Sequence, residues 1–174
     1  TAEARALYAG DTVRAVALAQ MPVLLLRVPG TVRVHLEPPG GVAKLGYPAP
    51  VTGEGSFVQP AALGFSYAAV VRTRREGRNT LIAITLATSN ESRDPVATGR
   101  ARADAALRLG WTAATAVHRA WWQKFWATSS VTIPDSALQA HYDLVKYFYG
   151  AAARRGAPPV PLQGVWTADA GGLP

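Results

Sequence analysis

Few residues that commonly carry out chemistry occur in this sequence, and their spacing excludes several kinds of site. The three histidines, His35, His118 and His141, lie far apart, and none has a histidine or glutamate three or four residues further on, as a helical zinc site requires. Cysteine is absent, which excludes a thiolate metal site, a disulfide and a catalytic thiol. Serine-nucleophile, phosphate-binding and dinucleotide-binding motifs are absent too, so we expect no metal and no cofactor. His118 lies one turn before Trp122, a spacing that favours a hydrogen-bonded histidine under aromatic cover.

The segment from Gln163 to Pro174 combines an amide, an indole ring and a single carboxylate. Asp169 is that carboxylate, and it precedes Ala170-Gly171-Gly172, a pattern typical of a turn. Hydrolysis of a glycoside ordinarily needs two carboxyl groups, one on each side of the scissile bond. Trp166 could stack on the face of a pyranose ring, or it could fill a seam between helices. We therefore assign no catalytic residue within this chain.

Three helices are predicted to lead into this segment. Asp94 and Pro95 are suited to the start of an Ala-rich helix that Gly110 stops, and the next helix runs from about Thr112 to Ala127. Aromatic residues recur along it at helical spacing, so we expect this helix to be buried on most sides. A further helix is expected from Pro134-Asp135 to Arg155, where Gly156 can end it.

An ordered series of residues runs through these helices and into the last loop. It comprises His118, Trp121, Trp122, Phe125 and Trp126, then Ile133-Pro134-Asp135, Tyr142, Tyr149, Arg155 and Gly156, and finally Leu162-Gln163-Gly164-Val165-Trp166. The series resembles the junction of glycoside hydrolase family 95, the α-L-fucosidase-like enzymes. In that family a connecting helix enters the first helix of an (α/α) six-hairpin toroid.

The resemblance implies an enzyme that hydrolyses α-linked L-fucose, or a related sugar, with inversion. It places Gln163, Trp166 and Asp169 in the substrate site, because planar amide and carboxylate groups pair well with vicinal hydroxyls. Thr167 departs from the family, in which an asparagine often follows the tryptophan. The family's general acid and base lie further along the toroid, beyond Pro174, so we expect this chain to be an inactive fragment.

The composition of the chain argues against nucleic-acid binding and against a membrane span. The chain has 174 residues, 49% of them hydrophobic, which is ample for a packed core. Its net charge of +7 would suit nucleic acid, but the basic residues are scattered. The densest run, Arg72, Arg74, Arg75 and Arg78, is interpreted as a solvated hairpin end. No apolar run approaches the length of a membrane span, and neither the compartment nor the oligomeric state can be inferred.

The first half of the chain favours antiparallel strands. Residues 22–28 are almost continuously apolar, which favours a central strand, and residues 32–36 alternate apolar with polar side chains. Pro29-Gly30 between them predicts a hairpin. A second hairpin is predicted from residues 65–73 and 80–88, with 74–79 as its turn. Residues 38–60, rich in proline and glycine, are expected to be a long loop that crosses the sheet.

The sequence thus predicts an α+β chain in three parts. Residues 1–93 would be the C-terminal part of a β-sandwich, residues 94–128 a helical linker, and residues 129–174 the start of the toroid. The expected partner is a carbohydrate, with no nucleic acid and no membrane span. An alternative is a non-catalytic carbohydrate-binding module with an aromatic platform, and tryptophan fluorescence with free sugars would distinguish it.

Overall fold

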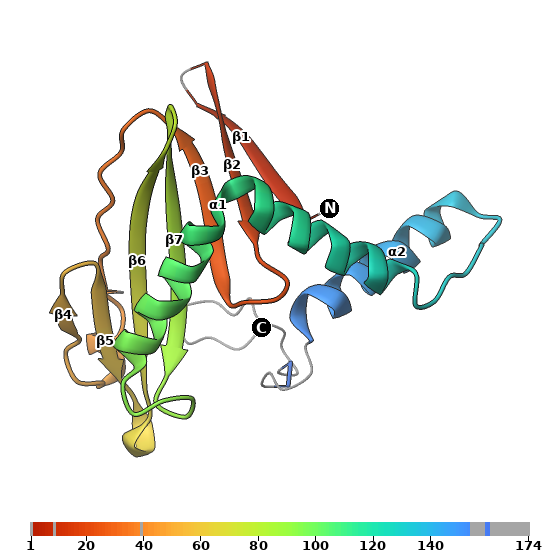
Figure 1. Cartoon of the computed structure of the whole chain (residues 1–174). Helices are drawn as coiled ribbons and strands as arrows, with labels where there is room; N and C mark the ends of the chain where they lie inside the picture. Colours follow the sequence, from red (N-terminus) through yellow and green to blue (C-terminus); the bar gives the residue numbers. More distant parts are fainter. Residues whose placement is uncertain (1, 9, 39, 154–158, 161–174) are drawn as a thin grey trace. The chain divides into compact units, whose positions relative to one another are not determined.

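The structure is a computed structural model, and it describes residues 2–8, 10–38, 40–153 and 159–160. These residues form an antiparallel sheet and two α-helices, so the predicted α+β class is confirmed (Figure 1). The strands are β1 (Glu3–Tyr8), β2 (Asp11–Ala17), β3 (Val23–Pro29), β4 (Val51–Gly53), β5 (Ser56–Pro60), β6 (Ser66–Glu76) and β7 (Asn79–Thr88). The helices are α1 (Pro95–Trp126), α2 (Ser136–Ala152) and two 3-10 turns, η1 (Ala43–Leu45) and η2 (Ala62–Gly64).

The strands form one sheet in the order β1-β2-β3-β7-β6-β5-β4, and every neighbouring pair is antiparallel. Strand β3 is an interior strand, since it pairs with β2 on one side and with β7 on the other. The sheet therefore joins two groups of strands along a seam between segments that are far apart in the sequence.

The predicted β6–β7 hairpin is confirmed, and it is longer than expected. The strands pair from Tyr67 with Thr88 to Glu76 with Asn79, which leaves only Gly77 and Arg78 to form the turn. Residues 74–76, predicted as part of the turn, belong to β6. The side chain of Arg75 explains part of this extension, because it donates to the hydroxyl of Thr80 (3.1 Å) and to backbone oxygens.

Two predictions about the earlier strands are wrong. Residues 31–38 contain no strand, and the expected partner of β3 is replaced by β2 and β7. The predicted long loop, residues 38–60, contains β4 and β5. Gln59 holds this region on the sheet, because its buried amide donates to the carbonyls of Pro48 (2.9 Å) and Pro60 (2.7 Å).

The first part of α1 covers one face of the sheet (Figure 1). Small and aliphatic residues meet there, and the core cluster comprises Val16, Val23, Leu25, Leu81, Ala83, Ala103, Ala106, Leu107, Trp111 and Ala114. The helix comes so close to the strands at Gly99 that a Cβ atom would lie 2.7 Å from Val70 Cγ2. Only glycine lets the backbone pack at this distance without displacing Val70.

The opposite face of the sheet is apolar as well. Residues alternate between the faces, so the partners of Leu24 and Leu26 across the β3–β7 pairing, Ile84 and Ile82, lie on this second face. An antiparallel sheet with solvent on its second face normally alternates apolar with polar residues. The composition of both faces is typical of a layer that packs on two sides.

Helix α1 is interrupted at Gly110, as predicted. Gly110 has φ 74° and ψ 169°, a backbone conformation that is essentially restricted to glycine. The carboxylate of Glu76 accepts a hydrogen bond from the backbone N–H of Trp111 (3.1 Å), and a Cβ on Gly110 would lie 2.6 Å from that same oxygen. Glu76 therefore caps the second half of the helix from the end of β6.

The chain divides into two compact units, residues 1–121 and 122–174. In the second unit, Asp135 caps α2 by accepting hydrogen bonds from the backbone of Ala137 (2.8 Å) and Leu138 (3.0 Å), as its position in the sequence predicts. The first unit begins α1 in the same way, since Asp94 accepts from Ala97 N–H (2.9 Å). Both helix starts predicted from an aspartate are thus confirmed.

Candidate functional site

The three residues predicted to bind sugar, Gln163, Trp166 and Asp169, lie outside the described residues. Gly156 and Arg155, which the sequence places at the end of the last helix, lie outside them too. The sugar-binding prediction therefore stays a prediction. The predicted helix end at Arg155 is wrong, because α2 ends at Ala152 and the backbone of Ala153 is already extended.

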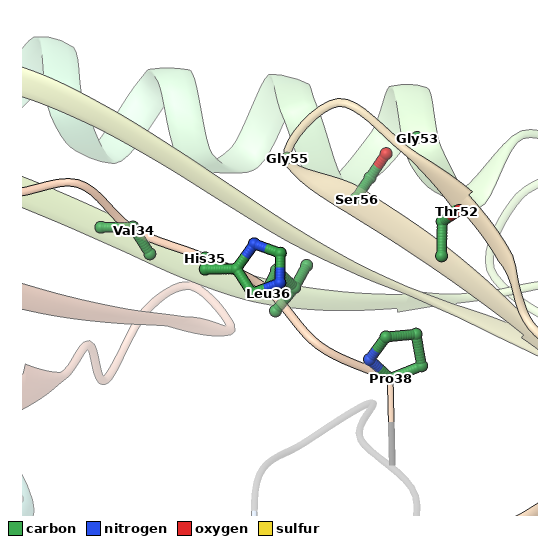
Figure 2. Close-up of a pocket in the computed structure, with 8 residues that line it drawn as sticks. All are labelled: Val34, His35, Leu36, Pro38, Thr52, Gly53, Gly55 and Ser56. Carbon is green, nitrogen blue, oxygen red and sulfur yellow. The ribbon is translucent and has the colours of Figure 1, made fainter. Parts of the chain in front are cut away.

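A pocket of about 310 Å³ lies in the first unit, beside the β4–β5 hairpin (Figure 2). One side is the extended segment before β4, which contributes Val34, His35, Leu36 and Pro38. The other side is the hairpin itself, which contributes Thr52, Gly53, Gly55 and Ser56. The two sides differ in chemistry, because one is mainly aliphatic and the other carries hydroxyls and glycine backbone.

The β4–β5 turn has its shape because two glycines flank Glu54. Gly55 has φ 61°, and a Cβ there would lie 2.8 Å from the carbonyl oxygen of Val71. A Cβ on Gly53 would lie 3.2 Å from Ser56 Oγ. A side chain is thus excluded at Gly55, which packs against the backbone of β6, and would be tight at Gly53.

The polar groups of the pocket are suited to binding rather than to bond breaking. His35 Nε2 lies 3.4 Å from Glu37 Oε1, but both side chains are about four-fifths exposed, at 82% and 79%. Among the described residues, no hydrogen bond joins His35 to Ser56, so the serine has no base that would activate it. A catalytic dyad also needs a rigid, water-poor setting, which these exposures exclude.

The other two described histidines have structural or solvent-exposed positions. His118 is buried at 2% exposure, and its Nδ1 accepts a hydrogen bond from Ala19 N–H (3.2 Å). The prediction of a hydrogen-bonded, covered histidine is therefore confirmed. His141 is exposed on α2. Within the described ranges, no three histidine, cysteine, aspartate or glutamate residues are grouped as a metal ion would require.

The predicted basic hairpin end is exposed, and most of its arginines have partners. Arg72 bonds Asp104 on α1 (3.1 Å), and Arg74 lies 3.5 Å from Glu76. Arg75 bonds Thr80 and backbone oxygens near the turn. These contacts orient the guanidinium groups toward the protein itself, which is unlike a basic patch that is free to bind phosphates.

Two carboxylates of the first unit are held in their ionised form. The side-chain hydrogen bond from Arg14 is the largest cause that lowers the pKa of Glu3 below its usual 4.5. A hydrogen bond from Arg102 (2.8 Å), with others from Thr88, lowers the pKa of Glu91 in the same way. Both groups lie away from the pocket lining, so their shifts reflect ion pairing that supports the fold.

The aromatic residues of the second unit form a packed cluster with one cation. Trp122 is buried, stacks on Tyr147 with ring centroids 5.2 Å apart, and meets Phe125 edge-on at 5.4 Å. Lys146 lies over Trp126 at 5.1 Å and donates to the Trp126 carbonyl (3.1 Å) at the end of α1. A ring enclosed in this way is unavailable as a sugar platform.

The expectation that the helix from residue 112 to 127 is buried on most sides is wrong. Val117 is 42% exposed, and Thr112, Ala113, Gln123 and Lys124 are exposed as well. The i, i+4 aromatic pairs therefore mark one packed face, and the helix has a solvent face opposite it.

The types of the lining residues do not indicate a pocket in the sequence. Thr52 and Ser56 lie in the segment predicted as an irregular loop, and only Gly53-Glu54-Gly55 signalled a tight turn.

No helix within the described ranges combines the length and hydropathy that crossing a bilayer requires. No protein-family model matches this sequence, and no curated protein matches it.

Proposed function

We propose that this chain is part of a glycoside hydrolase of the α-L-fucosidase-like type, acting on α-linked L-fucose or a related sugar in oligosaccharides or polysaccharides. In this proposal the sheet is one layer of an N-terminal β-sandwich, α1 is the linker helix, and α2 is the first helix of an (α/α) toroid. Residues 1–93, 94–128 and 129–174 would be the corresponding parts.

The observation that carries the proposal is the ordered series from His118 to Trp166. The described members of that series have structural positions that suit a junction between domains. His118 is buried and hydrogen-bonded, Trp122 is packed among other rings, and Asp135 begins α2 as its cap. The two apolar faces of the sheet also suit a layer within a sandwich.

The chemistry proposed for the complete enzyme is a single displacement with inversion. One carboxylate activates a water molecule, while a protonated carboxyl group on the other side of the bond donates to the leaving oxygen. Neither group is assigned within this chain. Gln163, Trp166 and Asp169 would bind the sugar, with the indole against the ring and the amide and carboxylate on its hydroxyls.

The test compares the 174-residue chain with a complete protein that contains it. The chain alone is expected to leave an aryl α-L-fucoside intact, and the complete protein is expected to hydrolyse it with inversion, followed by NMR of the released sugar. Gln163→Ala should lower kcat/KM several-fold to about tenfold, the value of one neutral hydrogen bond. Gln123→Ala, an exposed amide on α1, is the matched control.

Two outcomes would contradict the proposal. Turnover by the purified chain alone would mean that the active site is misplaced. Unchanged kcat/KM in both Gln163→Ala and Trp166→Ala, with normal stability, would make the last loop a surface connection. A change in tryptophan fluorescence of the inactive chain with free sugar would favour a carbohydrate-binding module instead.

A further inference from the structure

We propose that the pocket between residues 34–38 and the β4–β5 turn binds one neutral sugar residue, as a carbohydrate site separate from the last loop. This inference goes beyond the proposed hydrolysis and depends on the lining of the pocket alone. Its volume of about 310 Å³ lies at the lower end of ligand pockets, so one pyranose ring fits the space better than an oligosaccharide.

The charge of the lining excludes the main alternative ligands. Among the described residues, no lysine, arginine, aspartate or glutamate lines the pocket, so a phosphate or a carboxylate would meet no basic group except the imidazole of His35, and a cation would meet no carboxylate in the lining. Glu37 lies 3.4 Å from that imidazole, which further disfavours an anion. A neutral ligand remains.

The two walls match the two kinds of surface that a sugar ring presents. Val34, Leu36 and Pro38 offer aliphatic carbon to the C–H face of a ring. The hairpin side contributes Thr52 and Ser56, whose hydroxyls can both donate and accept hydrogen bonds. His35 adds an imidazole to the side formed by residues 34–38. A purely apolar ligand would leave these polar groups unpaired, which disfavours it.

The backbone of the turn adds to this polar wall. Gly53 and Gly55 both line the pocket, and a side chain is excluded at Gly55 by the Val71 carbonyl and would be tight at Gly53 against Ser56. The carbonyl of Gly55 already accepts a hydrogen bond from Val71 N–H (2.8 Å), so the glycines contribute a close approach of ligand to backbone rather than a set of free acceptors. Apart from the imidazole of His35, no aromatic ring lines the pocket, so we expect a dissociation constant on the order of 1 mM, typical of a few neutral hydrogen bonds.

The experiment is a two-dimensional NMR titration of the 174-residue chain with methyl α-L-fucopyranoside, methyl α-D-glucopyranoside and inorganic phosphate. Amide signals of residues 34–37 and 52–56 are expected to shift with at least one glycoside and not with phosphate. Shifts with phosphate alone would overturn the proposal, and so would the absence of any glycoside shift in these residues. Shifts confined to Gln163 and Trp166 would overturn it while supporting a site in the last loop.

Matched variants assign the binding to the pocket. Thr52→Val and His35→Ala remove polar groups from exposed side chains, and each should weaken binding about three- to tenfold. Thr73→Val and His141→Ala remove the same groups from exposed positions elsewhere and should leave binding unchanged. Equal affinities in the pocket and control variants would refute the assignment. Loss of hydrolysis in the complete protein would leave this binding intact, so the two proposals fail separately.

Discussion

The two units of the chain bury their apolar residues in different ways. In the first unit, aliphatic residues are enclosed between the sheet and α1, and Leu25, Leu81 and Val70 are completely inaccessible to solvent. In the second unit, the centre is an aromatic cluster around Trp122, and one side of α2 faces solvent. That side carries Leu138, Leu144, Val145, Phe148 and Tyr149, which are between 39% and 69% exposed.

The difference follows from what each unit offers for packing. A sheet of seven strands provides a surface wide enough to cover the apolar stripe of a helix. Two helices cover only the stripes that they turn toward each other, and α2 is apolar over more of its circumference than that. A large hydrophobic fraction in a sequence therefore does not by itself imply a closed core. The first unit buries most of its apolar side chains, whereas α2 in the second unit leaves several of them exposed.

The largest expected effect is in the closed core. Leu25→Ala should lower the free energy of unfolding of the first unit by about 2–5 kcal/mol, because it leaves a cavity among enclosed neighbours. Leu24→Ala is the matched control, since the adjacent Leu24 lies on the opposite face and is 39% exposed. It should lose only about 1 kcal/mol in the same denaturant titration. Equal losses would mean that both faces are equally packed.

The next effect concerns the break in α1. Gly110→Ala should destabilise the first unit by about 1–3 kcal/mol, because the residue would be strained and would displace Glu76 from the Trp111 N–H. Gly77→Ala introduces positive φ strain alone, since no atom lies near its Cβ position. Thermal unfolding should therefore separate the two variants, and identical melting temperatures would argue against the Glu76 contact.

In the second unit, Asp135→Ala should cost about 0.5–2 kcal/mol through loss of the α2 cap. Faster amide hydrogen exchange at Ala137 and Leu138 would report it, with exchange in the first unit unchanged. Asp143→Ala, on the same helix, removes only the Gln139 contact (3.2 Å) and should cost about 0.2–0.5 kcal/mol. Exchange that rises equally across both units would show that they unfold together.

The smallest effect is a dependence on acid that is specific to the first unit. Because the folded pKa of Glu3 and of Glu91 is below 4.5, their stabilisation is complete above pH 4.5 and declines as pH falls through the lower folded values. Urea titrations between neutral and acid pH should show this loss. Arg14→Met should reduce the slope more than Arg5→Met, since Arg14 is the larger cause of the Glu3 shift. The reverse order would contradict the assignment.

Local signals in the sequence predicted local structure well. Asp94 was placed correctly as a cap, Asp135 at the start of its helix and Gly110 as a break, because each effect acts within one turn of helix. The β6–β7 hairpin was also predicted, since its two strands are adjacent in the sequence. The hydrogen bond from Trp111 to Glu76 was not, because no local pattern links residues so far apart.

Strand pairing and the pocket could not be predicted for the same reason. Alternation in residues 32–36 indicates a chain that is extended, but not which strand it joins, and β3 pairs with β2 and β7 instead. Thr52 and Ser56 gain their positions from the β4–β5 pairing, which an irregular composition concealed. Gln163, Trp166 and Asp169 remain predictions from the motif series.

The β3–β7 pairing also affects the order in which the strands can pair during folding. β1, β2 and β3 are consecutive, and so are β4, β5, β6 and β7, so each group can zip together from short connections. Joining the groups requires closing the long chain between β3 and β7, an entropic cost that precedes any contact along the seam. We therefore expect Ala83→Gly, at the seam, to slow refolding, and Val13→Ala, on β2, to slow it as well, because the β1–β2 pairing would already be formed when the seam closes. Stopped-flow chevrons would reveal the order, and a refolding rate insensitive to Ala83→Gly would mean that the seam forms after the rate-limiting step.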